Sequence, residues 1–223
     1  MTAADAPARD ITRLIAGERR DLAAVLAGLP AQAWDSPTLC AGWRVREVVA
    51  HITMPFRYRP ARFAAEMIRS RGSFSRMADR CARRDAAAPP SQLAAALRDN
   101  EDHPWKPPGG GYQGALTHDV IHGLDITVAL GLRRRVPPDR LAIVLDGICA
   151  ARSVRFFGAD LGGVELRADD LDWSFGSGEP VSGSAQDLAL VVAGRKLPPG
   201  QLRGGPSARF TRVADPEPGK HLG

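Results

Sequence analysis

The chain has 223 residues, of which 44% are hydrophobic and 25% are charged, and its formal net charge at pH 7 is +5. This composition is ordinary for a globular protein, and the length is sufficient for a sizeable core. No apolar run reaches the roughly 18 residues of a membrane-spanning helix, so we predict no membrane partner.

Basic residues and cysteines exclude further classes of protein. The cations are almost all arginines, scattered along the chain without a recognition motif, so we expect no nucleic-acid partner. Three cysteines without a C-x-x-C pair make neither a disulfide framework nor a cysteine zinc site, and Cys40 is interpreted as a structural thiol. The start, Met1 to Asp5, lacks the features of a signal peptide, which predicts a cytoplasmic protein. Monomer and homodimer both remain open.

The first 158 residues predict helices. Apolar residues at a 3.6-residue period indicate a helix over 10–28, with Asp10 as N-cap. A second helix begins near Trp43 and either ends near 54 or kinks and resumes over 61–68, because prolines interrupt it. The remaining predicted helices are two short ones over 75–84 and 91–97, one that carries His118 and ends near Leu130 with Gly131 as its cap, and a last one over 137–158.

The rest of the chain predicts a small α+β domain. Period-two alternation indicates a hairpin of strands 164–168 and 171–175, followed by a turn over 176–180, a helix over 184–193 capped by Ser184 and a last strand over 208–213. We therefore predict a mainly α protein: a metal-binding helical bundle over 8–158, the small domain over 162–213 and a loose tail over 214–223.

Histidines on the predicted helices form the candidate site. His118 and His122 are four residues apart, so a helix places both on one face, where a single metal ion can bridge them. Asp125 falls on the same face, and His51 lies on the second helix as a third ligand. We predict that His51, His118 and His122 converge on one divalent metal. The alternative is a buried histidine pair satisfied by hydrogen bonds to carboxylates or backbone.

The loop over 100–112 leads into the helix that carries His118. Loops in this position often border a binding site. His103 and Trp105 therefore either line a pocket or only pack within the loop.

Two motifs carry a resemblance to a known family. The stretch Leu39-Cys40-Ala41-Gly42-Trp43-Arg44-Val45 with His51, followed by His118-Asp-Val-Ile-His122-Gly-Leu-Asp125, resembles the mycothiol-dependent maleylpyruvate isomerase family of the DinB-like superfamily. The stretches Leu171–Gly176 and Val181–Leu188, ending in Gly194-Arg195, are similar to the family's small second domain. The resemblance covers roughly 10–212 and implies a DinB-like four-helix bundle followed by a small α+β domain.

The resemblance also implies a metal and a catalytic residue. It implies a divalent ion, most often zinc, with nickel or another ion as alternatives, held at the positions of His51, His118 and His122. The isomerase branch has a glutamate where this chain has His118, and three histidines are the arrangement of other branches. Arg195 matches an arginine that the isomerase branch uses in catalysis; the alternative is a charge that bonds the carbonyls at a helix end.

These expectations lead to two hypotheses of function. The first is a metal-dependent enzyme in which mycothiol, or a similar small thiol, attacks a small electrophile in an isomerisation or an S-transfer. Arg195 would bind an anionic group of the substrate, and Asp125 would orient an imidazole or form a salt bridge. The second is a non-catalytic metal- or ligand-binding protein with the same fold.

Overall fold

The structure is a computed structural model, and it describes residues 5–213. These residues form two compact units that divide between Gly147 and Ile148. The predicted domain ranges stay predictions, and the tail predicted over 214–223 lies outside the described residues. Each unit has its own architecture, and the candidate histidines all belong to the first.

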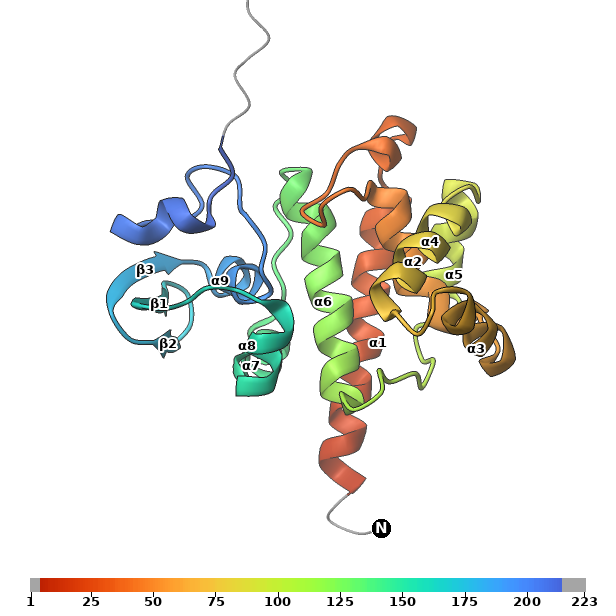
Figure 1. The fold of residues 1–223 in the computed structure, drawn as a ribbon, viewed down its shortest axis with the longest axis horizontal. Helices are drawn as coiled ribbons and strands as arrows, with labels where there is room; N and C mark the ends of the chain where they lie inside the picture. The colour runs from red at the N-terminus through yellow and green to blue at the C-terminus, as the bar shows by residue number, and fades with distance from the viewer. Residues whose placement is uncertain (1–4, 214–223) are drawn as a thin grey trace, which may run out of the picture. The chain divides into compact units, whose positions relative to one another are not determined.

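The first unit is helical, as the sequence predicts. Its helices are α1 (Asp5–Ala27), α2 (Val45–Arg57), α3 (Pro60–Arg69), α4 (Phe74–Asp85), α5 (Pro90–Arg98), α6 (Gly111–Ala129) and the greater part of α7 (Pro138–Cys149). A 3-10 turn, η1 (Ala31–Asp35), joins α1 to the loop before α2. In Figure 1, α1 and α6 run side by side, and α2 packs against α4, α5 and α6.

Apolar stripes from four helices make one hydrophobic cluster of the core. The buried residues of this cluster come from α1, α2, α5 and α6: Leu22, Ala23, Leu26, Val45, Val48, Val49, Ala50, Ile52, Leu93, Leu97 and Ile126, with Trp34 and Ala86 from the connections. The periodic stripes predicted for α1 and α2 are therefore their buried faces. A second cluster of Met54, Tyr58, Met77 and Cys81 attaches the α3–α4 pair to α2.

Prolines set several of the helix ends. The second helix passes through Pro55 and ends at Arg57, after which Tyr58 and Arg59 are extended. A residue before proline disfavours the α conformation, so the chain breaks at Arg59 and restarts with Pro60 in the first turn of α3. The first helix begins at Asp5, so the prediction of Asp10 as its N-cap is wrong. Pro7 is tolerated because it lies in the first turn, where a missing N–H costs nothing.

The C-terminal end of α6 follows the prediction closely. Gly131 has φ +65° and donates its N–H to the carbonyl of Val128, while Leu132 donates to the carbonyl of Thr127. This pair of bonds is a Schellman motif, which requires a left-handed residue at the position of Gly131.

The predicted helix over 137–158 is two helices. After α7 ends at Cys149, Ala150 is extended (φ −58°, ψ 136°), and α8 (Ala151–Phe157) follows. No proline lies at this break, and Gly147 is within the last turn of α7 and not at the break itself, so the periodic pattern runs through it undetected.

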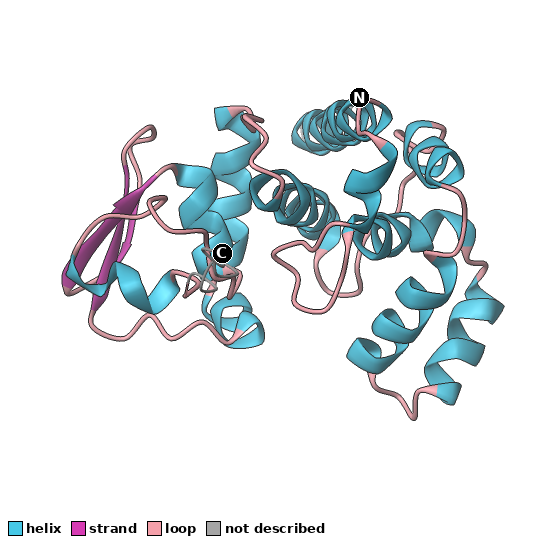
Figure 2. Ribbon diagram, turned by 90° about the horizontal axis from the view of Figure 1, so that it is seen from above, coloured by secondary structure: helices cyan, strands magenta, loops and turns pink. Residues whose placement is uncertain are grey.

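A small mixed sheet characterises the second unit. Its strands β1 (Val164–Ala168), β2 (Ser174–Gly176) and β3 (Glu179–Gly183) have the order β2-β1-β3. Leu166 pairs with Phe175 in the antiparallel direction and with Val181 in the parallel direction. In Figure 2 the three strands lie together as one sheet. The small α+β domain is thus present, with β2 shorter than the predicted strand over 171–175.

Two predictions in this unit need correction. The strand β3 begins at Glu179, inside the turn predicted over 176–180. Pro180 is tolerated there because β3 lies at the edge of the sheet. The last strand predicted over 208–213 is wrong: the first half of that stretch belongs to the 3-10 turn η2 (Gly205–Phe210), which has Pro206 in its first turn. The helix α9 (Ala185–Val192) is as predicted, with Ser184 Oγ accepting from the Asp187 N–H at 3.3 Å.

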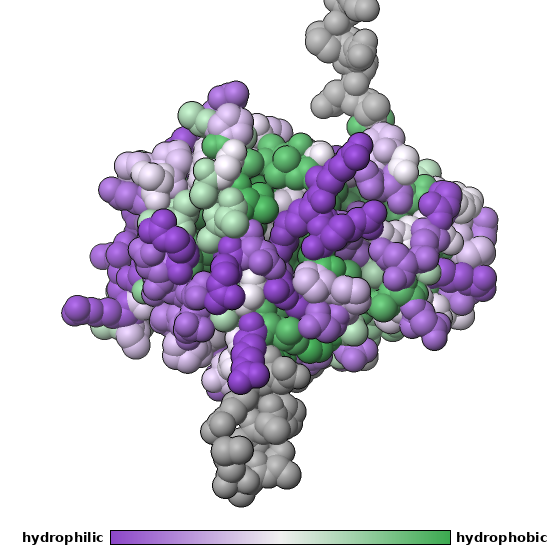
Figure 3. Space-filling model, turned by 180° about the vertical axis from the view of Figure 1, so that it is seen from behind, coloured by the Kyte–Doolittle hydropathy of each residue, from purple (hydrophilic) through white to green (hydrophobic). Residues whose placement is uncertain are grey.

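The surface alternates polar and apolar groups. On the face shown in Figure 3, hydrophilic side chains surround smaller hydrophobic areas, as on most folded proteins. Within residues 5–213, none of the helices is both long enough and apolar enough to cross a lipid bilayer.

Candidate metal centre

His51, His118 and His122 come together in the first unit. His51 Nε2 lies 3.3 Å from His118 Nε2, and the three rings are 4.9 to 5.1 Å apart between centroids. One ring nitrogen from each residue lies within 4.8 Å of the other two. The sequence therefore identified three side chains that do meet, although 67 residues separate His51 from His118.

Helix geometry explains the convergence. The four-residue spacing places His118 and His122 one turn apart on α6, and the packing of α2 against α6 brings in His51 from the other side. His51 is buried, with 7% of its surface exposed, whereas His118 and His122 are half-buried. The cluster is thus open on the side of α6.

Two carboxylates hold the α6 histidines. His118 Nδ1 lies 3.0 Å from Asp119 Oδ1, and His122 Nδ1 lies 3.0 Å from Asp125 Oδ2. Carboxylates are acceptors, so Nδ1 is the nitrogen that donates in each pair, and in a neutral ring Nε2 is then the nitrogen with the lone pair. This arrangement prepares both Nε2 atoms as ligands, in the manner of carboxylate–histidine–zinc triads.

The spacing of the nitrogens fits a metal ion. Zinc–nitrogen bonds of about 2.0–2.1 Å in tetrahedral geometry place two ligand nitrogens about 3.4 Å apart. The 3.3 Å between His51 Nε2 and His118 Nε2 agrees with this value. The same distance also suits an N–H···N hydrogen bond between the rings, so the geometry accommodates the alternative of a buried histidine pair as well.

Sequence reasoning missed the buried arginine behind His118. Arg19 Nε donates to Asp119 Oδ2 at 2.7 Å, and both side chains are buried. A second guanidinium nitrogen of Arg19, Nη1, donates hydrogen bonds to three backbone carbonyls of the loop before α6, those of Asn100, Glu101 and His103. Arg19 lies on the apolar stripe of α1 between Ile15 and Leu22, and a charge on such a stripe was the signal available in the sequence.

Aromatic rings line the rest of the cluster. The Trp105 ring lies 5.1 Å from that of His118, and the Trp43 ring lies 5.0 Å from that of His51. Trp43 is fixed by a 2.8 Å bond from its Nε1 to Asp79. The loop over 100–112 therefore does contribute a residue to the border of the site.

His103 belongs to the loop packing and not to the histidine cluster. Its ring packs at 5.0 Å from Phe56, and its Nδ1 accepts the Trp105 N–H at 3.2 Å. Burial, together with the nearby Arg19 charge, holds the pKa of His103 below its usual range. The side chain is therefore neutral at pH 7 and available as an acceptor.

Cys40 lies close to His122 and Asp125. Donor atoms of these three residues lie within 4.8 Å of one another, and Cys40 is half-buried. The neighbouring Leu39 N–H donates to the carbonyl of Asp125 at 3.0 Å, so the loop before α2 is attached to α6 at this point.

Arg195 lies just after α9 in the second unit. Its Nη1 donates to the Ala193 carbonyl at 3.1 Å, which is the bond expected of a charge at a helix end. The catalytic roles assigned to Arg195 and Asp125 from the sequence stay predictions.

Comparisons with known proteins agree with the resemblance. Residues 15–103 match the family model described as mycothiol maleylpyruvate isomerase N-terminal domain. The fold is similar to the crystal structures of the mycothiol-dependent maleylpyruvate isomerase and of a mutant of it in which alanine replaces a histidine, with TM-scores of 0.52 and 0.54 at 13% identity, over 97% of this chain and 98% of each of those chains. Uncharacterized proteins from two strains of Mycobacterium tuberculosis, CDC 1551 / Oshkosh and ATCC 25618 / H37Rv, are each 27% identical over 80% of this chain and 82% of their own length.

Proposed function

Because residues 15–103 belong to the mycothiol maleylpyruvate isomerase N-terminal domain family, we propose that this protein is a metal-dependent enzyme that uses a small thiol. The thiol is mycothiol or a similar low-molecular-weight thiol, and the second substrate is a small electrophile. The reaction is an isomerisation or an S-transfer. The family supplies the expectation of chemistry, and the residues of the cluster support it.

The arrangement of His51, His118 and His122 is the observation that carries the proposal. Two of the three imidazoles have Nδ1 engaged by a carboxylate, which leaves Nε2 as the ligand atom. Three neutral ligands suit zinc in a catalytic site, with nickel or another divalent ion as alternatives. When bound, such an ion supplies a Lewis acid that lowers the pKa of a thiol.

The chain's own residues would hold the thiol and substrate. Trp43 and Trp105 border the histidines and restrict the access of water. The thiol loses its proton, and its sulfur forms a bond to an electrophilic carbon as a carbon–carbon π bond of the substrate opens. In an isomerisation the substrate then rotates, the carbon–sulfur bond breaks and the double bond re-forms. In an S-transfer the carbon–sulfur bond remains and a leaving group such as halide departs with its electron pair. Arg195 is proposed to pair with an anionic group of the substrate through its planar guanidinium.

A non-catalytic metal-binding protein is the second candidate. The proximity of Cys40 to His122 favours it, because a thiolate in the fourth position would leave no place for a cosubstrate. X-ray absorption of the zinc-loaded protein separates the two candidates: three nitrogens and one oxygen support the enzyme, whereas a sulfur that is lost in Cys40→Ser supports the closed site.

Metal content is the first test of the proposal. The protein is purified without a His-tag or chelator, and its metals are measured by plasma mass spectrometry. We expect about one zinc or similar ion per chain, lost in His51→Ala and retained in the control His103→Ala, whose ring packs on Phe56. Absence of metal, with none taken up on titration, would show that the histidines are a core cluster.

Activity is the second test. The wild-type protein is assayed with mycothiol and either maleylpyruvate or an activated aryl halide, which report on isomerisation and S-transfer. With an active pair, the double variant His118→Ala/His122→Ala is expected to lose at least 100-fold in kcat/KM. An undiminished rate in that variant would contradict the mechanism.

A further inference from the structure

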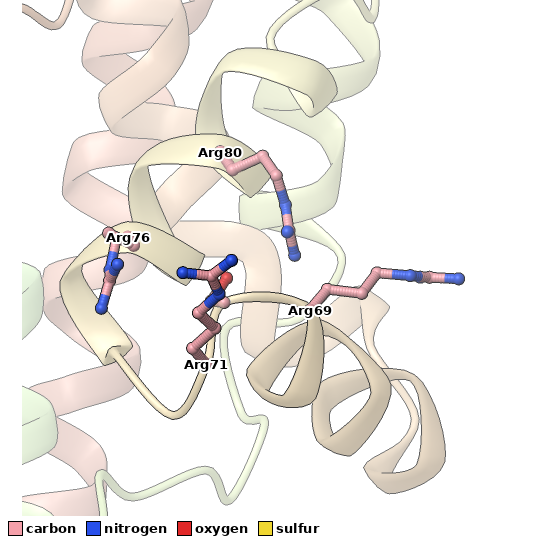
Figure 4. A pocket seen from close by; sticks show the side chains of 5 residues that line it. Arg69, Arg71, Arg76 and Arg80 are labelled. Carbon is pink, nitrogen blue, oxygen red and sulfur yellow. The ribbon is translucent and has the colours of Figure 1, made fainter.

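A group of arginines surrounds a hollow in the first unit, at the turn between α3 and α4. The hollow has a volume of about 220 Å³ and is lined by Arg69, Ser70, Arg71, Arg76 and Arg80. In Figure 4, Arg71 reaches from the turn to a place between Arg76 and Arg80, while Arg69 extends away from them. None of these residues takes part in the histidine cluster.

The carboxylate beside the hollow is already paired with arginines. The buried carboxylate of Glu66 accepts from Arg80, from Arg84 at 2.7 Å and from Arg69 at 3.4 Å. Among the described residues, no carboxylate lies within ion-pair distance of Arg71 or Arg76. Both side chains are exposed at the rim. The hollow therefore carries an excess of positive charge that the described part of the chain does not neutralise.

The backbone conformation of Arg71 is unusual. Within residues 5–213, Arg71 is the one residue other than glycine that has a left-handed backbone, with φ +52°. The turn is a Schellman motif, in which Arg71 donates to the Ile68 carbonyl and Gly72 to the Met67 carbonyl. Glycine or asparagine normally occupies the position of Arg71, because other side chains are strained there. The sequence thus keeps a guanidinium at a position where a smaller residue would be more stable.

We propose that this hollow is a binding site for a phosphate group. Guanidinium groups present paired N–H donors that match phosphate oxygens, and a tetrahedral phosphate accepts from several guanidinium groups at once. Arg76 lies in the first turn of α4, so the partial positive charge of the helix N-terminus adds to that of the arginines. Arg71 and Arg76 are the principal donors to the phosphate. Arg80 donates to the phosphate too, while it stays paired with Glu66.

The phosphate belongs either to a soluble molecule or to a lipid headgroup. Ile68 and Phe74, at the two ends of the same turn, are large apolar residues with 77% and 49% of their surface exposed. Exposed apolar side chains beside arginines would enter the interface of an anionic bilayer. A soluble ligand would need only the arginines. Experiments with free phosphate and with vesicles distinguish the two sources.

Titration with inorganic phosphate at constant ionic strength, followed by the arginine Nε–H signals in ¹H–¹⁵N NMR spectra, tests the site. We expect saturable shifts for Arg71, Arg76 and Arg80, and at least tenfold weaker binding in Arg71→Asn/Arg76→Ala. Asparagine removes the charge at position 71 and tolerates the left-handed backbone. The control Arg13→Ala/Arg59→Ala removes two other exposed arginines and should bind as the wild type does.

Three results would overturn the proposal: shifts that do not saturate, shifts that chloride reproduces, or equal weakening in the control variant. Cosedimentation with phosphatidylglycerol vesicles then identifies the source. Binding to vesicles that is lost in Ile68→Ser/Phe74→Ser, with phosphate binding intact, assigns the site to a lipid headgroup. Phosphate binding without vesicle binding assigns it to a soluble ligand, and both results support the phosphate site.

Discussion

At the scale of single residues, the candidate centre depends on side chains that do not face a ligand themselves. Asp119 and Asp125 fix the ring orientation of His118 and His122, and Arg19 in turn fixes Asp119. Such partners raise the basicity of a ligand and restrict its rotation, so their loss lowers metal affinity without removing a ligand.

Asp125→Asn is expected to lower zinc affinity by about 10- to 100-fold, because an amide binds the His122 Nδ1–H more weakly than a carboxylate does. Competition with a chromophoric chelator measures the dissociation constant. The control Asp99→Asn removes an exposed carboxylate that is paired with Arg98. An unchanged constant for Asp125→Asn would show that this carboxylate does not support a ligand.

Arg19→Met is expected to destabilise the protein by about 3–5 kcal/mol, because it leaves the Asp119 carboxylate buried without its cation. Urea unfolding followed by circular dichroism measures the change. The neighbouring Arg20 pairs with Glu101 of the same loop but is largely exposed, so Arg20→Met should change stability little. Equal losses in both variants would contradict the role given to burial.

At the scale of elements, the sequence predicts most helices and fewer strands. The apolar period of α1, α2 and α6 is strong, and Ser184 and Gly131 mark helix ends through local bonds that sequence alone specifies. The strand β3 was missed because its pairing with β1 is a parallel contact that no local signal encodes.

The candidate site shows the same division. The spacing of His118 and His122 along one helix predicts their proximity. By contrast, the partnership of Arg19 with Asp119 depends on how α1 packs against α6, across 100 positions of sequence. Tertiary packing sets such pairs, and no pattern of local spacing reveals them.

Gly131→Ala is expected to cost about 1 kcal/mol, because it forces a Cβ into the left-handed conformation that ends α6. No neighbouring atom lies within 4 Å of that Cβ, so the loss measures backbone strain alone. Gly28→Ala is the control: Gly28 is not among the positive-φ glycines, and its Cβ would make ordinary contacts. Thermal unfolding of both variants provides the comparison, and a stable Gly131→Ala would refute the strain.

The stability of the α3–α4 pair is expected to depend on pH. The hydrogen bond from Arg84, together with the charges of Arg80 and Arg69, holds the pKa of the buried Glu66 carboxyl below its usual range. Its stabilisation is complete above the unfolded pKa of about 4.3 and is lost as the pH falls through the lower folded pKa. Glu66→Gln is therefore expected to flatten the acid limb of the stability curve, and an unaltered limb would contradict this assignment.

At the scale of the whole molecule, a bound metal ion should stabilise the two units to different extents. All three candidate ligands belong to the first unit, while the mixed sheet belongs to the second. A ligand that binds only the folded state stabilises the part that holds it.

Zinc at 100 times its dissociation constant is expected to add about 2.7 kcal/mol to the stability of the first unit and nothing to the second. Calorimetry with and without a chelator should therefore move one part of the unfolding profile. The movement should vanish in His51→Ala. A uniform shift of the whole profile would indicate that the units unfold together.

The separation of His51 from the α6 histidines has a consequence for biosynthesis. A growing polypeptide presents His51 well before His118 and His122, which follow it by 67 and 71 positions. A nascent chain therefore offers an arriving ion a single imidazole until α6 has left the ribosome, and the i, i+4 pair then forms within one helix. Full coordination must wait until α2 has docked, so metal loading would report that the first half of the protein has folded.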